Sequence, residues 1–483
     1  MNEALRTLGR AMGEHHLFLV GGAVRDELLG RPHADWDLAT DLMPEAVMQK
    51  AKAAKLRALP TGLQHGTVTV MVGDEGFEIT TFREDMDYLD GRHPEGVKLG
   101  VTLEEDLSRR DFTVNAMALP LEAVGSEDWK ARLVDPFGGQ RDLEAKLIRA
   151  VGDPLKRFKE DGLRPLRACR FAAQLGFDIE PATLTAIPRR LEVARKVAVE
   201  RVLQELNKLL TGRHPAEGLR HLESTGLLDL WLPELQAEVG CGQHGHHRYP
   251  VWDHTLRVLE ELAATGHRAL KTAWAALLHD AGKPPTRTVE PDGDAHFYGH
   301  EAVSVEMAAT MLRRLKAGND LIQQVSALVK HHGAHPDERW SDSACRRLLR
   351  RFHEDDLDEP AWHALRLADQ MAKGWGDEPL TPSPDDGLSG EAWRAAVKAR
   401  CEAVRARLER LKAGQPPLSV KHLALDGRAL MALANRPGGP WLGALQKHLL
   451  EIVLEDPAKN TAGVLSRIAS AELKKADHPS MST

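Results

Sequence analysis

The sequence predicts an α+β protein in which a small mixed sheet with helices precedes a long all-helical body. Its 483 residues suffice for about three or four ordinary domains. Strand signals gather before residue 150, in Leu17–Val20, Gly66–Val72 and Phe77–Phe82. Beyond that point apolar residues recur at helical spacing, and glycine and proline mark the breaks.

Charge and cysteine content exclude several classes of protein. The net charge of -7 excludes a globally basic nucleic-acid-binding protein. Residues 141–213, however, carry 16 Lys and Arg against 10 Asp and Glu, which indicates either a local polyanion site or a solvated helix face. Four scattered cysteines exclude a disulfide scaffold. No apolar run approaches the ~18 residues of a membrane span, and residues 1–13 do not resemble a signal peptide, so we expect a cytoplasmic protein without a membrane partner.

A strand-to-turn motif opens the head. Leu17–Val20 runs into Gly21 and Gly22, and a helix is expected to start at Val24. Two glycines allow a tight turn that aims backbone N–H groups at an anion, and the helix start adds a positive end. Such turns are also common without a ligand, so this one indicates a phosphate site only together with other motifs.

Two acids, Asp35 and Asp37, follow this turn. In a strand, residues i and i+2 share a face, so we expect the two carboxylates to lie side by side. That arrangement suits a cation between them, and Mg²⁺ prefers oxygen ligands. Two exposed acids in a loop are the alternative interpretation.

Further motifs stand in order behind these two. They are Gly66–Val70 (GTVTV), Glu78–Arg83 (EITTFR), Arg109–Ala116 (RRDFTVNA), Asp135–Gly139 (DPFGG), Glu160–Arg164 (EDGLR) and Val199–Val202 (VERV). The whole set, between residues 15 and 215, resembles the class II tRNA nucleotidyltransferases, the CCA-adding enzymes, and the related bacterial poly(A) polymerases. The resemblance implies a polymerase β-like nucleotidyltransferase head followed by a helical neck.

The resemblance also implies roles for individual residues. Asp35 and Asp37 would bind Mg²⁺ while an RNA 3′-hydroxyl attacks the α-phosphate of a nucleoside triphosphate. Glu78 is either a third acid near the metals or a strand acid paired with Arg83 or Arg110. The residues expected to bind the nucleotide are Gly21, Gly22, Arg25, Arg110, Asp111, Asn115, Asp161, Arg164, Arg167 and Arg170.

Asp161 and Arg164 are the most informative of these residues. On a helix, positions i and i+3 share a face, so a carboxylate acceptor would lie beside a guanidinium donor. Cytosine and adenine each offer an amino group beside a ring-nitrogen acceptor and match this pair. Uracil and guanine present the reverse order and would leave both groups unpaired, at about 1–3 kcal/mol per buried group. An ordinary surface ion pair is the alternative.

The segment Glu84–Pro94 resembles the mobile loop with which CCA-adding enzymes switch from C to A. We therefore expect addition of C, C and A to tRNA from CTP and ATP. An A-adding enzyme or a poly(A) polymerase of the same fold is the alternative.

Histidines are concentrated in the middle of the chain. Eleven of the 23 lie between His244 and His335. The ordered set of His254, His279, Asp280, His300, His331 and Asp369 resembles the all-helical HD phosphohydrolases. The resemblance implies a transition-metal site (Mn²⁺, Ni²⁺, Co²⁺ or Fe), with His332 as the alternative to His331 and with Lys283 steadying a phosphate. His244, His246, His247 and His335 are interpreted as loop residues with weak RNA contacts.

The expected domains follow from these motifs. They are the nucleotidyltransferase head (1–150), a base-selecting and RNA-binding neck (151–215), the HD domain (216–375), a linker rich in Pro, Asp, Gly and Ser (376–390), and a helical tRNA-binding tail (391–483). An HD phosphohydrolase whose head only binds RNA is the alternative from another class, and the intact acids and base-selecting pair of the head argue against it.

Overall fold

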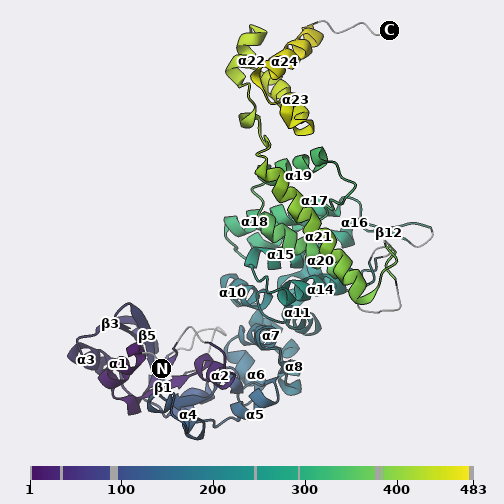
Figure 1. The fold of residues 1–483 in the computed structure, drawn as a ribbon. Coiled ribbons are helices and arrows are strands. Elements are labelled where there is room, and N and C mark those ends of the chain that lie inside the picture. Colours follow the sequence, from purple (N-terminus) through teal and green to yellow (C-terminus); the bar gives the residue numbers. More distant parts are fainter. Residues whose placement is uncertain are drawn as a thin grey trace. The chain divides into compact units, whose positions relative to one another are not determined.

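The computed structural model describes residues 3–32, 36–86, 96–243, 247–291, 294–375, 382–384 and 386–477. Within it the chain forms two compact units, Met1–Gln236 and Ala237–Thr483, each of which is described by itself (Figure 1). The predicted neck therefore shares a unit with the head, and this unit extends some twenty residues beyond the predicted boundary at 215.

The first unit contains a six-stranded sheet, four strands outside this sheet, and helices that come before, between and after the strands in the sequence. Its strands are β1 (Leu17–Val20), β2 (Leu38–Thr40), β3 (Arg57–Gly62), β4 (Thr67–Val72), β5 (Glu75–Thr81), β6 (Arg83–Asp85), β7 (Val97–Leu99), β8 (Ala118–Pro120), β9 (Leu147–Ile148) and β10 (Asp178–Ile179). Its α-helices are α1 (Glu3–Met12), α2 (Gly22–Leu28), α3 (Pro44–Ala53), α4 (Leu103–Ser108), α5 (Gly139–Glu144), α6 (Pro154–Glu160), α7 (Arg164–Leu175), α8 (Pro181–Ala186), α9 (Leu191–Ala194), α10 (Val199–Leu210), α11 (Pro215–Ser224), α12 (Leu227–Trp231) and α13 (Pro233–Gln236).

The sheet confirms the mixed topology. Its strand order is β3-β4-β5-β2-β1-β8, with β2 and β5 parallel and the other pairs antiparallel. The alternating residues Val68 and Val70 of β4 and Phe77 and Ile79 of β5 are buried, and α1 and α3 pack against this part of the sheet. The order places β1 and β2 next to each other, so the glycine turn and Asp37 lie at neighbouring strand ends.

The neck is built by α7, α10 and α11, which pack on one another. α7 buries almost its whole length, including Leu166, Cys169 and Phe171, because it lies between the head and the other neck helices. α10 buries one face, formed by Val202, Glu205, Leu206, Leu209 and Leu210. The buried helix α7 therefore holds the basic residues of the neck in fixed positions.

The described residues of the second unit form helices and one short hairpin. Its elements are α14 (Val251–Ala264), α15 (Leu270–Leu278), α16 (Lys283–Thr286), β11 (Thr288–Val289), β12 (Ala295–His296), α17 (His300–Arg314), α18 (Asn319–His331), α19 (Asp342–Glu354), α20 (Glu359–Met371), α21 (Gly390–Ala413), α22 (Gly427–Ala434), α23 (Pro440–Glu455) and α24 (Ala462–Asp477). None of the helices in the described part of the chain combines the length and apolar surface needed to cross a bilayer.

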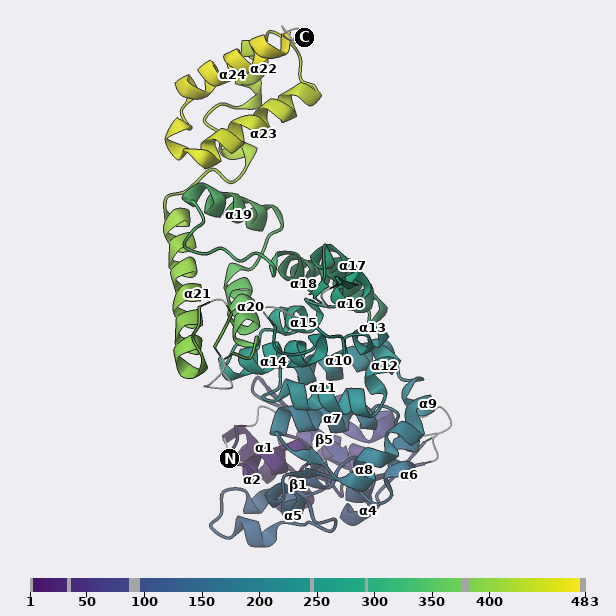
Figure 2. The same ribbon diagram turned by 90° about the vertical axis from the view of Figure 1, so that its right-hand side faces the viewer.

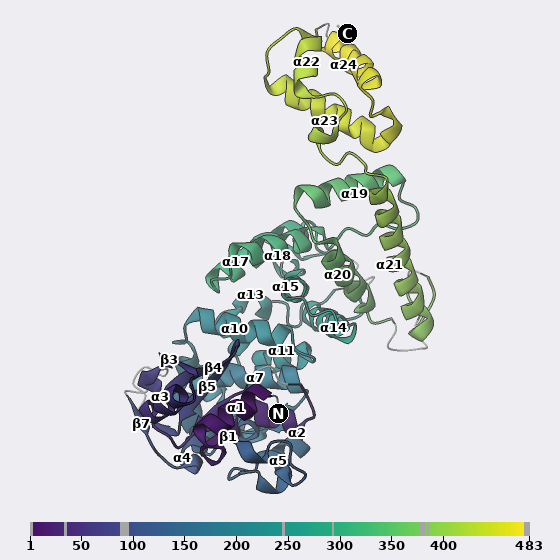
Figure 3. The same ribbon diagram turned by 60° about the vertical axis from the view of Figure 1, so that its left-hand side comes forward.

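Helix α21 belongs to the HD body, whereas the boundary expected at residue 391 assigns it to the tail. Its buried residues Trp393, Val397 and Cys401 pack with Met371 of α20, and α21 also contacts α19 (Figure 2). The tail proper is a separate core formed by α22, α23 and α24 (Figure 3). Arg346 of α19 fixes this tail by donating hydrogen bonds of 2.5 and 2.7 Å to two carbonyls at the end of α23.

Candidate functional site

The glycine turn between β1 and α2 forms one wall of the first site. Gly21 has φ +69° and ψ −135°, a conformation that residues with side chains rarely adopt. A Cβ atom here would lie 2.9 Å from a guanidinium nitrogen of Arg110 and 3.5 Å from Asp37 Oδ2. Glycine is therefore required both by the backbone and by the approach of these side chains. Helix α2 begins at Gly22, two residues before the expected Val24.

Asp37 lies directly before β2 and not inside a strand as expected. Its carbonyl accepts a 3.0 Å hydrogen bond from the backbone N–H of Val20, which continues the pairing of β1 with β2. Burial lowers the pKa of the Arg110 guanidinium, and the nearby carboxylates of Asp106 and Asp37 oppose that shift. Asp35, the expected partner of Asp37, lies outside the described residues.

Glu78 holds a position equivalent to that of Asp37 on the adjacent strand. Strand β5 runs parallel to β2, and Ile79 lies opposite Leu38. Glu78 and Asp37 therefore each stand one residue before a member of this pair. The Glu78 side chain is exposed. Its two candidate arginine partners bind other acids, Arg83 with Asp85 at 3.4 Å and Arg110 with Asp106 at 3.3 Å.

A buried network joins the head to the neck. Asp111 is 8% exposed and accepts hydrogen bonds of 2.8 and 2.6 Å from Arg167. Its other oxygen accepts from Asn115 Nδ2 and from the backbone N–H of Phe112. Burial alone would raise the pKa of this carboxyl, but the charge and hydrogen bonds of Arg167 hold it well below its usual range. Asn115 Oδ1 in turn accepts a 2.7 Å hydrogen bond from Arg25.

Three guanidinium groups surround the buried ring of Phe171. Those of Arg170, Arg25 and Arg167 lie 3.5, 5.2 and 5.5 Å from the ring centroid. Arg170 also donates a 2.8 Å hydrogen bond to Glu205. Because the negative face of an aromatic ring attracts cations, this ring helps to hold neighbouring positive charges together. The cluster offers a positive wall that suits a triphosphate.

Asp161 and Arg164 flank a break between two helices, whereas the sequence spacing predicted one continuous helix. Helix α6 ends at Glu160, Asp161 is extended (φ −135°, ψ 111°), and α7 begins at Arg164. Gly162 lies in the break, where a Cβ atom would stand 2.5 Å from the carbonyl oxygen of Val193. The turn, and not a helical i,i+3 relation, therefore sets the separation of the two side chains.

Separate partners orient the two groups. Arg201 donates a 3.1 Å hydrogen bond to Asp161 Oδ2. Arg164 donates to the carboxylate of Glu160 at 2.7 Å and to the carbonyl of Arg109 at 2.8 Å. Arg164 is 7% exposed, so its guanidinium plane is fixed before any ligand arrives. The arrangement can present an acceptor and a donor to a base edge.

These groups line a single cavity of about 590 Å³. The predicted residues that line it are Gly21, Gly22, Arg25, Asp37, Arg110, Asp111, Asn115, Asp161, Arg164, Arg167 and Arg170. Asp26, Arg109 and Lys208 also line it and were missed, because a helical lysine such as Lys208 has the pattern of any solvated residue. The loop interpreted as the C-to-A switch falls largely on residues 87–95, outside the described residues.

The second site gathers two groups of metal-ligating side chains. The first is His254, His279 and Asp369, and the second is Asp280, His300 and His332. Within each group the ligand atoms lie within 4.8 Å of one another. All six residues except His300 are buried. Imidazole nitrogens with carboxylate oxygens form a donor set that suits divalent transition metals.

Asp280 lies between the two groups. Its Oδ2 is 3.2 Å from His279 Nε2 and 3.9 Å from His254 Nε2. Its Oδ1 is 3.5 Å from His300 Nε2 and 3.6 Å from His332 Nε2. The buried Nε2 of His279 makes no hydrogen bond among the described residues. One carboxylate thus serves both groups, and the buried donors fit two adjacent cations that share it.

The second ring nitrogen of each histidine lies close to a backbone carbonyl. The Nδ1 contacts are His254 with Ala372 (3.4 Å), His279 with Ala276 (2.8 Å), His300 with Phe297 (2.9 Å) and His332 with Val329 (2.7 Å). A carbonyl can only accept, so Nδ1 carries the proton and Nε2 is left as the ligand atom.

The structure places His332, the expected alternative, and not His331, in the second group of metal-ligating side chains. Nε2 of His331 lies 2.6 Å from Asp355 Oδ2, and its ring packs edge-on against Phe352. Trp362 Nε1 donates a 2.8 Å hydrogen bond to the His331 carbonyl. Adjacent residues at a helix end point about 100° apart, so only one of the two histidines can face Asp280.

A cavity of about 400 Å³ opens onto these ligands. Lys283 Nζ lies in it, 2.7 Å from Asp280 Oδ2 and 2.8 Å from Gln243 Oε1. His247 and His335, which were interpreted as loop residues, also line it, and burial lowers their pKa values to about 2 and about 4. His244 and His246 lie outside the described residues.

Glu238 is a buried acid near this site that the sequence analysis missed. Burial and the negative charge of Asp280 raise the pKa of its carboxyl to about 8. It accepts a 3.1 Å hydrogen bond from Thr255 Oγ1. A single acid before a turn carries no distinguishing pattern in the sequence.

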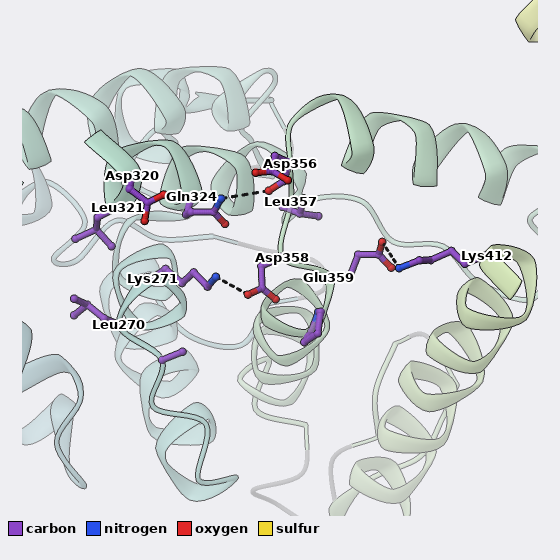
Figure 4. A pocket seen from close by; sticks show the side chains of 12 residues that line it. Leu270, Lys271, Asp320, Leu321, Gln324, Asp356, Leu357, Asp358, Glu359 and Lys412 are labelled. Carbon is purple, nitrogen blue, oxygen red and sulfur yellow. Dashed lines mark hydrogen bonds and ion pairs between the residues drawn. The ribbon is translucent and has the colours of Figure 1, made fainter. Parts of the chain in front are cut away.

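A further cavity, of about 800 Å³, lies beside α15, α18 and α20 (Figure 4). Its two lysines point toward acids: Lys271 lies 2.5 Å from Asp358, and Lys412 lies 2.9 Å from Glu359. These ion pairs join α15 to α20 and α21 to α20, so they have a structural role.

Comparison with known proteins agrees with the two sites. Residues 17–149 match the Poly A polymerase head domain, 176–239 the probable RNA and SrmB-binding site of polymerase A, and 251–374 the HD domain. The A-adding tRNA nucleotidyltransferase of Deinococcus radiodurans is 37% identical over 90% of each chain. The CCA-adding enzyme of Geobacillus thermodenitrificans is 34% identical over 92% of this chain and 90% of its own.

A solved structure extends the match to the whole fold. The Bacillus stearothermophilus CCA-adding enzyme in complex with CTP has a TM-score of 0.69 and 26% identity, and it covers 99% of this chain and 100% of its own. The head and HD domains that the family models match imply dependence on divalent metal ions. The chain belongs to the tRNA nucleotidyltransferase family, together with CCA-adding and A-adding enzymes.

Proposed function

We propose that the chain adds C, C and A to the 3′ end of tRNA, using CTP and ATP and releasing pyrophosphate. The observation that carries this proposal is the fixed pair Asp161 and Arg164 in the cavity that also holds the glycine turn. The relatives named as CCA-adding enzymes support it. Because the substrates are tRNA and nucleotides, we place this work in the cytoplasm.

The residues divide the work of the transfer. Gly21, Arg25 and Arg110 hold the triphosphate, and Asp37 with Asp35 and, as a further candidate, Glu78 would hold Mg²⁺. When bound, Mg²⁺ neutralises charge on the phosphates and favours ionisation of the attacking hydroxyl. The 3′-oxygen of the RNA forms a bond to the α-phosphorus, the bond from that phosphorus to the β-bridging oxygen breaks, and pyrophosphate leaves while the hydroxyl proton passes to solvent.

Base choice follows from hydrogen-bond order. The Asp161 carboxylate accepts from the amino group of cytosine or adenine, and the Arg164 guanidinium donates to the adjacent ring nitrogen. Uracil and guanine offer the opposite order, so the buried Arg164 and the partly buried Asp161 lose their partners. No nucleic-acid template is needed for this selection.

The Deinococcus radiodurans relative supports a second candidate, addition of A alone. Three tRNA transcripts, lacking CCA or ending in C or CC, would be given CTP, ATP or both, and the products sized on a gel. Growth of the first transcript by three nucleotides and no further is the expected result. Addition of A only to the CC-ended transcript would replace the proposal with the A-adding activity, and long A ladders would make the chain a poly(A) polymerase.

We further propose that the HD site hydrolyses phosphoesters. Water supplies the oxygen that bonds to phosphorus, the ester P–O bond breaks, and the alcohol leaves with a proton. His254, His279, His300, His332, Asp280 and Asp369 would hold Mn²⁺, Ni²⁺, Co²⁺ or Fe. Such ions act as Lewis acids toward the phosphoryl oxygens and the attacking water. Lys283, between Asp280 and Gln243, is placed to contact a phosphate.

A double dissociation tests both proposals together. Asp37→Ala should abolish nucleotide addition and retain hydrolysis, and His279→Ala with Asp280→Ala should do the reverse. Retention of addition by Asp37→Ala would contradict the role proposed for this carboxylate. Hydrolysis without addition by the unmodified chain would support the alternative in which the head only binds RNA.

A further inference from the structure

Lys208 is a cation of the nucleotide cavity (the cavity of about 590 Å³ in the first unit) that the proposed transfer leaves without a role. It stands near the end of α10 and lines the cavity together with Arg25, Asp26 and Pro32. Lys208 is exposed, and its side chain makes no hydrogen bond or ion pair among the described residues. An ammonium group in this setting has a positive charge that is available to a ligand.

The other cations of the nucleotide cavity differ from Lys208, because each of the six arginines that line it contacts a carboxylate. These ion pairs are Arg25 with Asp26 (2.9 Å), Arg109 with Asp106 (2.7 Å), Arg110 with Asp106 (3.3 Å), Arg164 with Glu160 (2.7 Å), Arg167 with Asp111 (2.6 Å) and Arg170 with Glu205 (2.8 Å). The arginines can still donate N–H groups to a ligand. Among the described residues that line the cavity, Lys208 is the cation whose charge no contacting acid offsets.

The acid that Lys208 could reach on its own helix is already bound. Glu205 precedes Lys208 by three residues, so the two side chains share a face of α10. The Glu205 carboxylate instead accepts a 2.8 Å hydrogen bond from Arg170 and lies 3.7 Å from a guanidinium nitrogen of Arg167. The packing of α10 on α7 therefore leaves the charge of Lys208 unpaired.

Helix α10 places Lys208 away from the base-selecting pair. Arg201, which donates a 3.1 Å hydrogen bond to Asp161, stands seven residues before Lys208. The two positions are therefore ~10 Å apart along the axis of α10. Between them Glu205 contacts Arg170, so α10 follows α7 along the cavity. A nucleoside triphosphate has the same polarity, with its base at one end and its γ-phosphate at the other.

Two further arginines add positive charge near this end of the cavity. Arg31 directly precedes a residue that lines the cavity, and Arg213 follows α10. Burial and then the charge of Arg213 lower the pKa of the Arg31 guanidinium; Asp26 opposes this shift and Arg25 adds to it. Positive charges therefore gather beside Lys208, and such a surface attracts an anion of high charge.

We propose that Lys208 binds the γ-phosphate of the incoming nucleotide, so that the site distinguishes a triphosphate from a diphosphate. This inference rests on the proposed nucleotide addition and gives it a further binding residue. Lys208 makes and breaks no covalent bond; its ammonium group donates hydrogen bonds to the terminal phosphate and offsets its charge. The pyrophosphate that leaves contains the same phosphate, so Lys208 holds it until release. Pyrophosphate should therefore compete with CTP and ATP through this contact.

Equilibrium dialysis of labelled CTP, CDP and CMP against the full chain, with Mg²⁺ and without tRNA, tests the contact directly. Because Lys208 is exposed, its replacement should not disturb folding. The ratio of the Kd for CDP to the Kd for CTP should fall about tenfold in Lys208→Met, as expected for the loss of a hydrogen bond to a charged group, and be retained in Lys208→Arg. Binding of CMP should not change. Lys196→Met removes an exposed lysine of the same unit outside the cavity and is the matched control.

The kinetics of addition separate this contact from a contact with RNA. Lys208→Met should raise the KM for CTP and the inhibition constant of pyrophosphate by about tenfold, and leave the KM for tRNA within about twofold. A raised KM for tRNA with unaltered inhibition by pyrophosphate would assign Lys208 to the RNA and overturn the inference. An unchanged ratio of Kd values in Lys208→Met would also overturn it, while nucleotide addition stands.

The two readouts also distinguish the inference from the proposed function. A chain that adds no nucleotide but loses its preference for CTP over CDP in Lys208→Met would remove the proposed function and keep this binding residue. A chain that adds no nucleotide and binds CTP equally well in Lys208→Met and Lys208→Arg would remove both.

Discussion

Replacing Arg167 with methionine should loosen the junction between head and neck. Arg167 makes two short hydrogen bonds to Asp111, which is nine-tenths buried. Removing one member of a buried ion pair costs about 3–5 kcal/mol. The Arg167 side chain is 32% exposed and Asp111 keeps its bonds to Asn115 and Phe112, so we expect about 2 kcal/mol after allowing for solvent screening.

Native-state hydrogen exchange is the suitable assay, because a chain of two units need not unfold in one step. A loss of about 2 kcal/mol corresponds to roughly thirtyfold faster exchange in peptides from α7 at pH 7. Arg195→Met, which removes an exposed arginine of the same unit, is the control and should change exchange less than about twofold.

The pH dependence has a defined sign. Arg167 lowers the folded-state pKa of Asp111, so the stability it supplies is complete above the unfolded-state value of about 3.9. That stability is lost as the pH falls toward the folded-state value. The difference in exchange between the unmodified chain and Arg167→Met should therefore persist down to about pH 4 and shrink as the pH falls further. Equal exchange at pH 7, or a difference that grows on acidification, would refute the reasoning.

Three further predictions concern other parts of the molecule. Bound manganese per chain can be measured by mass spectrometry after dialysis against excess Mg²⁺. It should fall by about one ion in His300→Ala and by about two in Asp280→Asn, and it should not fall in His331→Ala. Equal losses in all three variants would contradict the shared carboxylate. Gly162→Ala should lower the preference for CTP and ATP over UTP and GTP by about tenfold or more, since its Cβ displaces the turn, and unaltered fidelity in primer-extension assays would oppose this. Arg346→Met should speed hydrogen exchange in α23 about tenfold through loss of two bonds to carbonyls, and unchanged exchange there would assign the tail another anchor.

The sequence predicted best where a side chain's role depends on its immediate neighbours. The strand Leu17–Val20 and the turn at Gly21 appear as expected, because a short apolar run followed by two glycines has few alternative conformations. Five of the six principal residues that the resemblance proposes for the HD site lie in the two groups of metal-ligating side chains. The spacing of the HD motif predicts where these residues lie because the helices that carry them pack together in one arrangement.

The sequence predicted the structure less well where the rotation of a helix end or a contact between distant segments decides the position of a side chain. Neither His331 nor His332 has a distinguishing neighbour, and the choice depends on which one the end of α18 turns toward Asp280. The helix break at Gly162 depends on the approach of the Val193 carbonyl, a contact distant in sequence. The placement of α21 could have been predicted from the sequence. Its buried residues recur at helical spacing, which indicates a face packed on another helix; they are Trp393, Val397, Cys401, Val404 and Leu408.

The contacts of the four HD histidines with backbone carbonyls bear on how the domain exchanges its ions. Each imidazole is already in the tautomer and the orientation that a metal requires, so binding demands little ordering of side chains. The surrounding core, with Trp274, Trp362 and Phe352 buried, is held by apolar packing independent of any ion. Chelation should therefore leave the fold standing, and the site should bind ions again when they are returned.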